Sequence, residues 1–254
     1  TAYDCSSQLH KVVTVSFTDS GARLTSRSST SLSGKVNSSA TAIGSRTLSP
    51  QAQILDVSTT DKDKPGLYAV LYPQRLAGLT LEAGDVLWYE ADGTGAITKL
   101  ILRDVTGDMY DYGVLTDAQV MDEGFSVSAS YTYDIQGVQN TIAGLSRTYP
   151  VTEGQPIRVS ADERGLDSLT ALTRLDGFGE QLTLESVTVD GTVYPLGSEA
   201  CVYVRSFPAG GNQYTYYTVD ALLGLDQDFS LSVYVDAPIE DGGRVRVILA
   251  TPVQ

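Results

Sequence analysis

The chain has few of the residues on which metal sites and many catalytic sites depend. Its 254 residues include two cysteines, Cys5 and Cys201, and a single histidine, His10. Without a C-x-x-C pair or a second histidine, we expect neither a zinc site nor thiol redox chemistry. A nucleophile–base–acid triad would have to use His10, which lies beside the N-terminus, where a solvated side chain is the simpler expectation.

Basic residues and long apolar runs are also scarce. Lys and Arg number 17 against 31 Asp and Glu, a formal net charge of −14, which opposes binding to nucleic acid. No apolar run approaches the roughly 18 residues that cross a bilayer, and no basic-then-apolar leader is present. We therefore expect a mature domain or an excised fragment without membrane insertion. With 42% hydrophobic residues the chain can still build a packed core.

The two cysteines allow two interpretations. Cys201 stands in an apolar strand pattern and is expected to be a small buried thiol, while Cys5 lies near the N-terminus. A disulfide between them would close a long loop and remains open, because the sequence does not give their separation. So few cysteines suit an extracellular protein that depends on its core rather than on disulfides.

One hairpin pattern recurs along the chain. Each copy has an alternating apolar strand, a turn that contains Asp and Gly, and a second alternating strand. The four copies begin at Val13, Val86, Ile157 and Leu231. Three of them are followed by Gly34, Gly107 and Gly177, whose spacings are 107 − 34 = 73 and 177 − 107 = 70. Glycine at such a junction allows positive φ, so these positions are predicted module boundaries.

Three strands, a short helical connection and a closing hairpin predict an all-β fold of small five-stranded barrels, OB-like or SH3-like. In two copies a helical turn precedes the last hairpin. In the C-terminal copy, Thr218 is expected to cap this turn and Gly224 to end it. Asp190-Gly191 predicts a type I′ turn. The predicted division is a terminal hairpin of an incomplete module at 1–33, barrel modules at 34–105 and 176–254, and a shorter barrel module at 106–175.

Tyrosine is the aromatic residue that the chain does have in number, with 15 copies. Tyr214 and Tyr216 alternate in one strand pattern, and Trp88 lies in another. Exposed rings of this kind could stack on a glycan or a protein partner, whereas half-buried rings would favour strand pairing alone. These three residues are the candidate ligand-binding residues. We expect no catalytic residue, no metal ligand and no cofactor, because no recognised catalytic or phosphate-binding motif is present.

Three segments carry a resemblance to a known class of proteins: Tyr112–Ala118, Val187–Leu196 and Gly242–Ile248. In these segments the chain resembles the repeated β regions of large surface proteins from anaerobic Gram-positive gut bacteria, many of which carry S-layer homology domains. The resemblance implies an exported protein at the cell surface or in the cell wall. The chain itself has no S-layer homology segment, so no anchoring residue is carried over.

Two functions from different classes follow from this sequence. The first is a non-catalytic structural or spacer region of an exported bacterial surface protein. The alternative is a glycan- or protein-binding module that uses exposed tyrosines, with a cell-wall polymer, a glycan or another surface protein as its partner. An enzyme is not expected, because the required constellation of titratable groups is missing.

Overall fold

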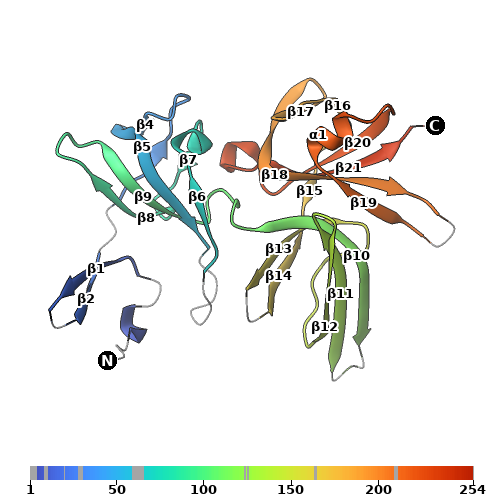
Figure 1. The fold of residues 1–254 in the computed structure, drawn as a ribbon, viewed down its shortest axis with the longest axis horizontal. Helices are drawn as coiled ribbons and strands as arrows, with labels where there is room; N and C mark the ends of the chain where they lie inside the picture. The colour runs from blue at the N-terminus through green and yellow to red at the C-terminus, as the bar shows by residue number, and fades with distance from the viewer. Residues whose placement is uncertain are drawn as a thin grey trace. The chain divides into compact units, whose positions relative to one another are not determined.

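The structure is a computed structural model (Figure 1), and it describes residues 5–8, 11–19, 21–27, 31–58, 66–122, 124, 126–162, 165–208 and 211–253. His10 lies outside the described residues. The fold is all-β, as predicted. The chain has two compact units: unit 1 is Thr1–Met109 with Glu240–Gly242, and unit 2 is Tyr110–Ile239 with Gly243–Gln254.

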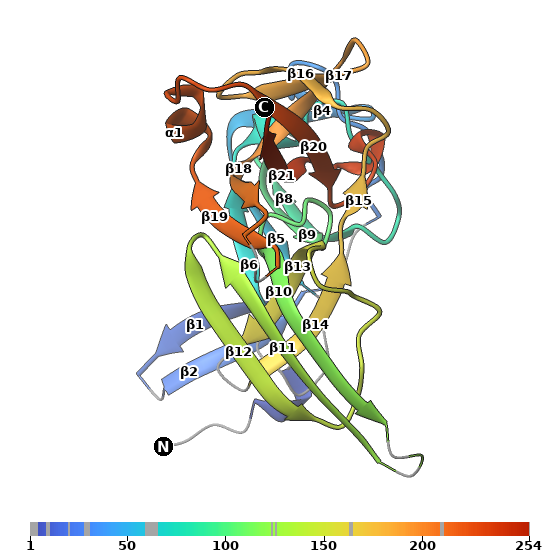
Figure 2. The same cartoon turned by 90° about the vertical axis from the view of Figure 1, so that its right-hand side faces the viewer.

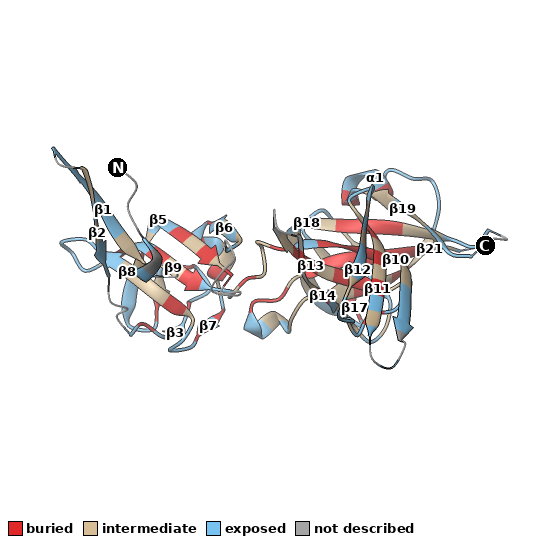
Figure 3. Ribbon diagram, turned by 90° about the horizontal axis from the view of Figure 1, so that it is seen from below, coloured by how far each residue is buried: buried red, intermediate tan, exposed pale blue. Residues whose placement is uncertain are grey.

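The N-terminal part of unit 1 is a two-stranded hairpin. A 3-10 turn, η1 (Ser6–Gln8), precedes the strands β1 (Val13–Thr18) and β2 (Gly21–Ser26), which pair with each other and with no other described strand. Alternation places Val15 and Phe17 on one face of β1, opposite Leu24 and Ala22 of β2. None of the described hairpin residues is buried, and Figure 3 shows both strands without a buried segment.

The rest of unit 1 is a sheet built around one long strand. Its elements are β3 (Gly34–Lys35), β4 (Ala42–Ile43), β5 (Arg46–Val57), β6 (Tyr68–Leu71), the 3-10 helix η2 (Pro73–Leu76), β7 (Thr80–Leu81), β8 (Val86–Ala91) and β9 (Ile97–Arg103). The main sheet has the order β4-β5-β9-β8, with β6 also paired to β5. β5 and β9 run parallel, whereas β3 pairs with β7.

The middle of the chain, in unit 2, forms a second sheet (Figure 2). Its strands are β10 (Asp111–Asp122), β11 (Val127–Ile135), β12 (Val138–Leu145), β13 (Pro156–Asp162) and β14 (Gly165–Ala171). Their order is linear, β12-β11-β10-β13-β14. The sequence predicts a closed, shorter barrel here, and among the described residues no pairing joins β12 to β14.

The C-terminal strands close into a five-stranded barrel. The elements are β15 (Thr173–Arg174), β16 (Gly179–Leu182), β17 (Ser186–Val189), β18 (Thr192–Ser206), β19 (Gln213–Tyr217), α1 (Val219–Leu223), β20 (Phe229–Val235), the 3-10 turn η3 (Ile239–Asp241) and β21 (Val245–Pro252). The pairings β16-β17-β18-β21-β20 return to β16 and close the ring. Helix α1 has the expected N-cap Thr218 and C-cap Gly224.

The three sets of strands share one cyclic order. If the strands of each set are numbered in chain order, the closed barrel pairs them as 1-2-3-5-4-1, with strands 3 and 5 parallel. The middle sheet has this order opened between strands 3 and 5. In unit 1 the strands β3, β4, β5, β9 and β8 follow the same order, and the first step is a bridge between Val36, next to β3, and Ile43 of β4. Among the described residues no pairing joins β8 to β3, so the ring is open there.

Each set of strands has its own hydrophobic core. One cluster spans Leu32–Leu102, a second Leu115–Leu169 and a third Val187–Ala250, and Figure 3 shows the buried stretches along the strands. Gly34, Gly107 and Gly177 all have positive φ, as expected. The exact module boundaries proposed from the sequence stay a prediction.

Candidate binding groove

The outer face of the sheet in unit 1 carries an apolar groove of about 630 Å³. Strands β5, β6, β8 and β9 supply its floor, and the segment at Tyr72 and Pro73 supplies one wall. Side chains alternate along a strand, so the buried Ile54 and Leu100 point to the core while their neighbours point into the groove. Its volume lies in the range typical of ligand sites.

One row of apolar side chains crosses this face from strand to strand. Val70 of β6 pairs with Leu55 of β5, Leu55 with Ile101 of β9, and Ile101 with Trp88 of β8. Val70 is 71% exposed, and the other three are half-buried. Beside them Tyr72 is 81% exposed. Exposed apolar groups gathered on one face are typical of a surface that contacts another molecule.

The charges nearest this row neutralise each other. Gln53 pairs with Lys99, and Lys99 with Glu90, in the neighbouring cross-strand row. Lys99 Nζ lies 3.5 Å from the Glu90 carboxylate, and both side chains are about half exposed. The groove therefore offers apolar surface and two aromatic rings, with amides and one ion pair at its border.

The three candidate residues predicted from the sequence do not form one site. Trp88 lines the groove of unit 1, whereas Tyr214 and Tyr216 belong to β19 in unit 2. Tyr72 and Val70 also line the groove and were not among the predicted residues. Their signal was the alternation of Tyr68, Val70 and Tyr72, which places three large side chains on one face, and all three are exposed.

Tyr214 and Tyr216 are half-buried and contact turns that precede them in the chain. The Tyr216 ring lies against Gly137, where a Cβ would be 3.5 Å from its Cδ1, and the Tyr214 hydroxyl lies against Gly154. Burial raises the pKa of both tyrosines. These rings cover parts of the same unit and do not form an open platform.

Tyr203 of β18 pairs with Tyr216, and its hydrogen bonds identify the segment that covers this face of the last barrel. Tyr203 is fully buried; its hydroxyl donates to Asp134 O at 2.9 Å and accepts from Gln136 N at 3.0 Å. Burial raises its pKa above the usual value. The end of the β11–β12 hairpin thus lies on β18 and β19, and the ring of Tyr216 lies 5.9 Å from that of Tyr203.

This covered face corresponds to the open groove of unit 1. In β5 and β9 the parallel register shifts between Leu48 and Gln53, and in β18 and β21 an equivalent shift falls between Leu196 and Cys201. Leu55 in unit 1 and Tyr203 in the last barrel therefore occupy equivalent positions in their sheets. By strand pairing, the row Val70–Leu55–Ile101–Trp88 corresponds to Tyr216–Tyr203–Leu249–Ser232.

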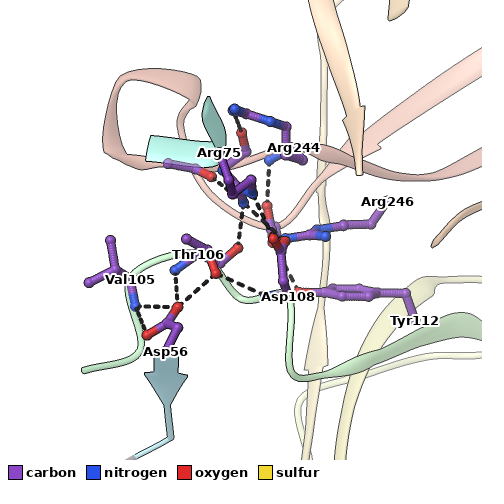
Figure 4. A network of polar contacts seen from close by, with 11 residues as sticks. Asp56, Arg75, Val105, Thr106, Asp108, Tyr112, Arg244 and Arg246 are labelled. Carbon is purple, nitrogen blue, oxygen red and sulfur yellow. Dashed lines mark hydrogen bonds and ion pairs between the residues drawn. The ribbon is translucent and has the colours of Figure 1, made fainter. Parts of the chain in front are cut away.

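A buried polar cluster holds the end of β9 in unit 1 (Figure 4). The Asp56 carboxylate is fully buried and accepts hydrogen bonds from Val105 N, Thr106 N and Thr106 Oγ1. Desolvation raises its pKa, and these hydrogen bonds oppose the increase. Arg75 Nε lies 2.6 Å from Asp108 Oδ2, and Arg75 Nη2 donates to the carbonyls of Thr106 and Gly242.

A second buried cluster belongs to unit 2 (Figure 4). Arg246 Nε lies 2.7 Å from Asp236 Oδ2, and both side chains are almost fully buried. The same carboxylate accepts from the Tyr112 hydroxyl and from Arg244 N. Cys201 is 1% exposed and its Sγ contacts the Tyr112 and Arg246 carbonyls. Burial raises the pKa of this thiol to about 12.

The cysteines and other titratable groups have defined places. Cys5 is exposed, Cys201 is buried, and neither is part of a disulfide. Among the described residues, no three His, Cys, Asp or Glu side chains lie close enough together to hold a metal ion. No helix in the described ranges is long and apolar enough to span a membrane.

Comparisons with known protein families, with curated proteins and with solved structures find no match.

Proposed function

We propose that this chain is a non-catalytic structural region of an exported bacterial surface protein, and that unit 1 supplies a binding site for another polypeptide. The observation that carries the proposal is the difference between two equivalent faces. In the last barrel the face is covered by the end of a hairpin that contacts Tyr203 and Tyr216. In unit 1 the same face is an open apolar groove.

The composition of the groove favours protein over glycan. Sugar sites need several hydrogen-bonding groups around an aromatic ring, whereas the row from Val70 to Trp88 consists of hydrophobic residues and the amides lie at the border of the groove. The charges of Lys99 and Glu90, which form the ion pair at the border, neutralise each other. Apolar side chains of a partner would remove this row from water, at about 25 cal/mol per Å² of apolar area buried.

Two features support the surface location that goes with this function. The repeated strand-and-turn segments resemble those of bacterial surface proteins, and the net charge of −14 favours solubility of an exported chain. The fold is held by packed β cores and buried polar clusters rather than by a disulfide between Cys5 and Cys201.

A selection experiment tests the proposed binding site. Random 12-residue peptides displayed on phage are selected on the immobilised full chain, and the binding of the selected peptides to a Val70→Lys variant is then measured. Val70 is 71% exposed, so the variant should fold normally while placing a charge in the groove. We expect selected peptides rich in aromatic and aliphatic residues that bind the wild type at least tenfold more tightly than the variant.

A matched control uses an exposed aromatic residue of unit 2, because the groove belongs to unit 1. Phe207 is 63% exposed in unit 2, and Phe207→Ser should leave peptide binding unchanged. Peptides that bind the wild type and Val70→Lys equally would contradict the proposal. Binding to a glycan array that is lost in Val70→Lys would assign the groove to carbohydrate and would also contradict it.

The spacer role within this proposal has its own support. Three sets of strands with one cyclic order follow each other along the chain, and glycines with positive φ stand at the proposed boundaries. Limited proteolysis tests it, with cleavage expected near Gly34, Gly107 and Gly177. A single resistant fragment that spans all three positions would contradict separable modules.

A further inference from the structure

The hairpin β1–β2 is the element of unit 1 that packs least. A two-stranded hairpin alone is marginally stable in water, yet these strands pair with no other described strand. Phe17 is 85% exposed and Val15 48%. They share one face with the half-buried Leu24 and Ala22, so the hairpin has an apolar face on which Val15 and Phe17 are exposed to solvent.

Within the hairpin, residues 13–26, the charges of Arg23 and Asp19 cancel, and the flanking cations Lys11 and Arg27 give this segment a positive charge, opposite in sign to the rest of the chain. Residues 11–27 contain Lys11, Arg23 and Arg27 against Asp19, a net charge of 3 − 1 = +2. The remaining residues then carry −14 − 2 = −16. Two copies repel each other over most of their surfaces, but this segment of one copy is attracted to the body of another.

We propose that the groove of unit 1 receives the β1–β2 hairpin of a second copy of this chain, with Phe17 inserted over Leu55 and Val70. This inference rests on the proposed function, because it names the partner of the same groove. It makes the contact heterologous: each copy offers a hairpin and a groove, so copies join head to tail.

The last barrel provides the precedent for a hairpin at this position. There the β11–β12 turn at Gln136 and Gly137 lies on the rings of Tyr203 and Tyr216. Those rings occupy the positions of Leu55 and Val70. With smaller side chains at both positions, unit 1 has space for an added ring, which Phe17 supplies close to the end of its own hairpin.

The proposed contact is small. One face of a hairpin of two six-residue strands should bury less area than a standard stable interface of about 1,600 Å², so the association should be weak and concentration-dependent. Within a polymer or at a surface, several such contacts would act together. The measurement must therefore cover concentrations up to the millimolar range.

Analytical ultracentrifugation of the full chain, with a reductant to prevent crosslinking through Cys5, tests the inference. The wild type and the control Phe207→Ser should form dimers and longer species as concentration rises. Phe17→Ser, which removes the inserted ring, and Val70→Lys, which charges the groove, should each raise the dissociation constant at least tenfold, about 1.4 kcal/mol.

A mixture of the two variants gives the sharpest result. Phe17→Ser retains an intact groove and Val70→Lys an intact hairpin, so their equimolar mixture should form a heterodimer and nothing larger. A mixture that stays monomeric while the wild type associates would overturn the head-to-tail contact. A wild type that stays monomeric throughout would overturn the inference alone if selected peptides still bind the groove. If no peptide binds either, the proposed function fails with it.

Discussion

The hydroxyl of Tyr203 provides a direct test of the covered face in the last barrel. Tyr203→Phe keeps the ring and its packing but removes an O–H that donates to Asp134 O at 2.9 Å and accepts from Gln136 N at 3.0 Å. Tyr203 is fully buried whereas Gln136 is exposed, so the substitution removes two hydrogen bonds that are each worth about 0.5–1.5 kcal/mol of stability. Their joint loss costs about 1–3 kcal/mol.

Two measurements test the effect of Tyr203→Phe. The midpoint of thermal unfolding, recorded by circular dichroism, should fall by about 4–8 °C for a loss of about 2 kcal/mol. The Gln136 amide should lose protection in hydrogen exchange, because Tyr203 is its acceptor. Tyr68→Phe, on a side chain that is 66% exposed, should change neither. A Tyr203→Phe protein with unchanged Gln136 protection would refute the contact on which the comparison of the two faces depends.

Three further predictions concern the interior. Arg246→Leu should destabilise the protein by about 3–5 kcal/mol in urea unfolding, because it leaves Asp236 charged and buried; a loss below 1 kcal/mol would contradict this. Gly113→Ala should cost about 3 kcal/mol, since its Cβ would lie 1.9 Å from a carbonyl oxygen, whereas Gly93→Ala meets nothing and should be nearly neutral. Cys201 should resist a thiol reagent at pH 8 until the protein unfolds, because its pKa is raised to about 12 and little thiolate forms.

Local pattern was enough to predict the fold class and several turns. Alternation gave the strands, Thr218 and Gly224 bound the helix as expected, and both Asp190 and Gly191 have the positive φ of the predicted type I′ turn. These features depend on neighbouring residues along the chain, which a sequence displays directly.

The site depended on pairings that a sequence does not display. Trp88 lies in a groove only because β8, β9, β5 and β6 are brought side by side. Tyr214 and Tyr216 looked equivalent to Trp88 as candidates, but turns far earlier in the chain cover them. Alternation identifies an aromatic face, and long-range packing decides whether that face is open.

The emission of Trp88, the single tryptophan of the chain, reports on the groove most directly. A peptide selected on the wild type should shift this emission to shorter wavelength and protect it from acrylamide quenching as the groove loses water. The same peptide should leave the Val70→Lys protein unchanged. A peptide that binds the chain tightly without altering Trp88 emission or quenching would contradict the claim that this groove is the binding site.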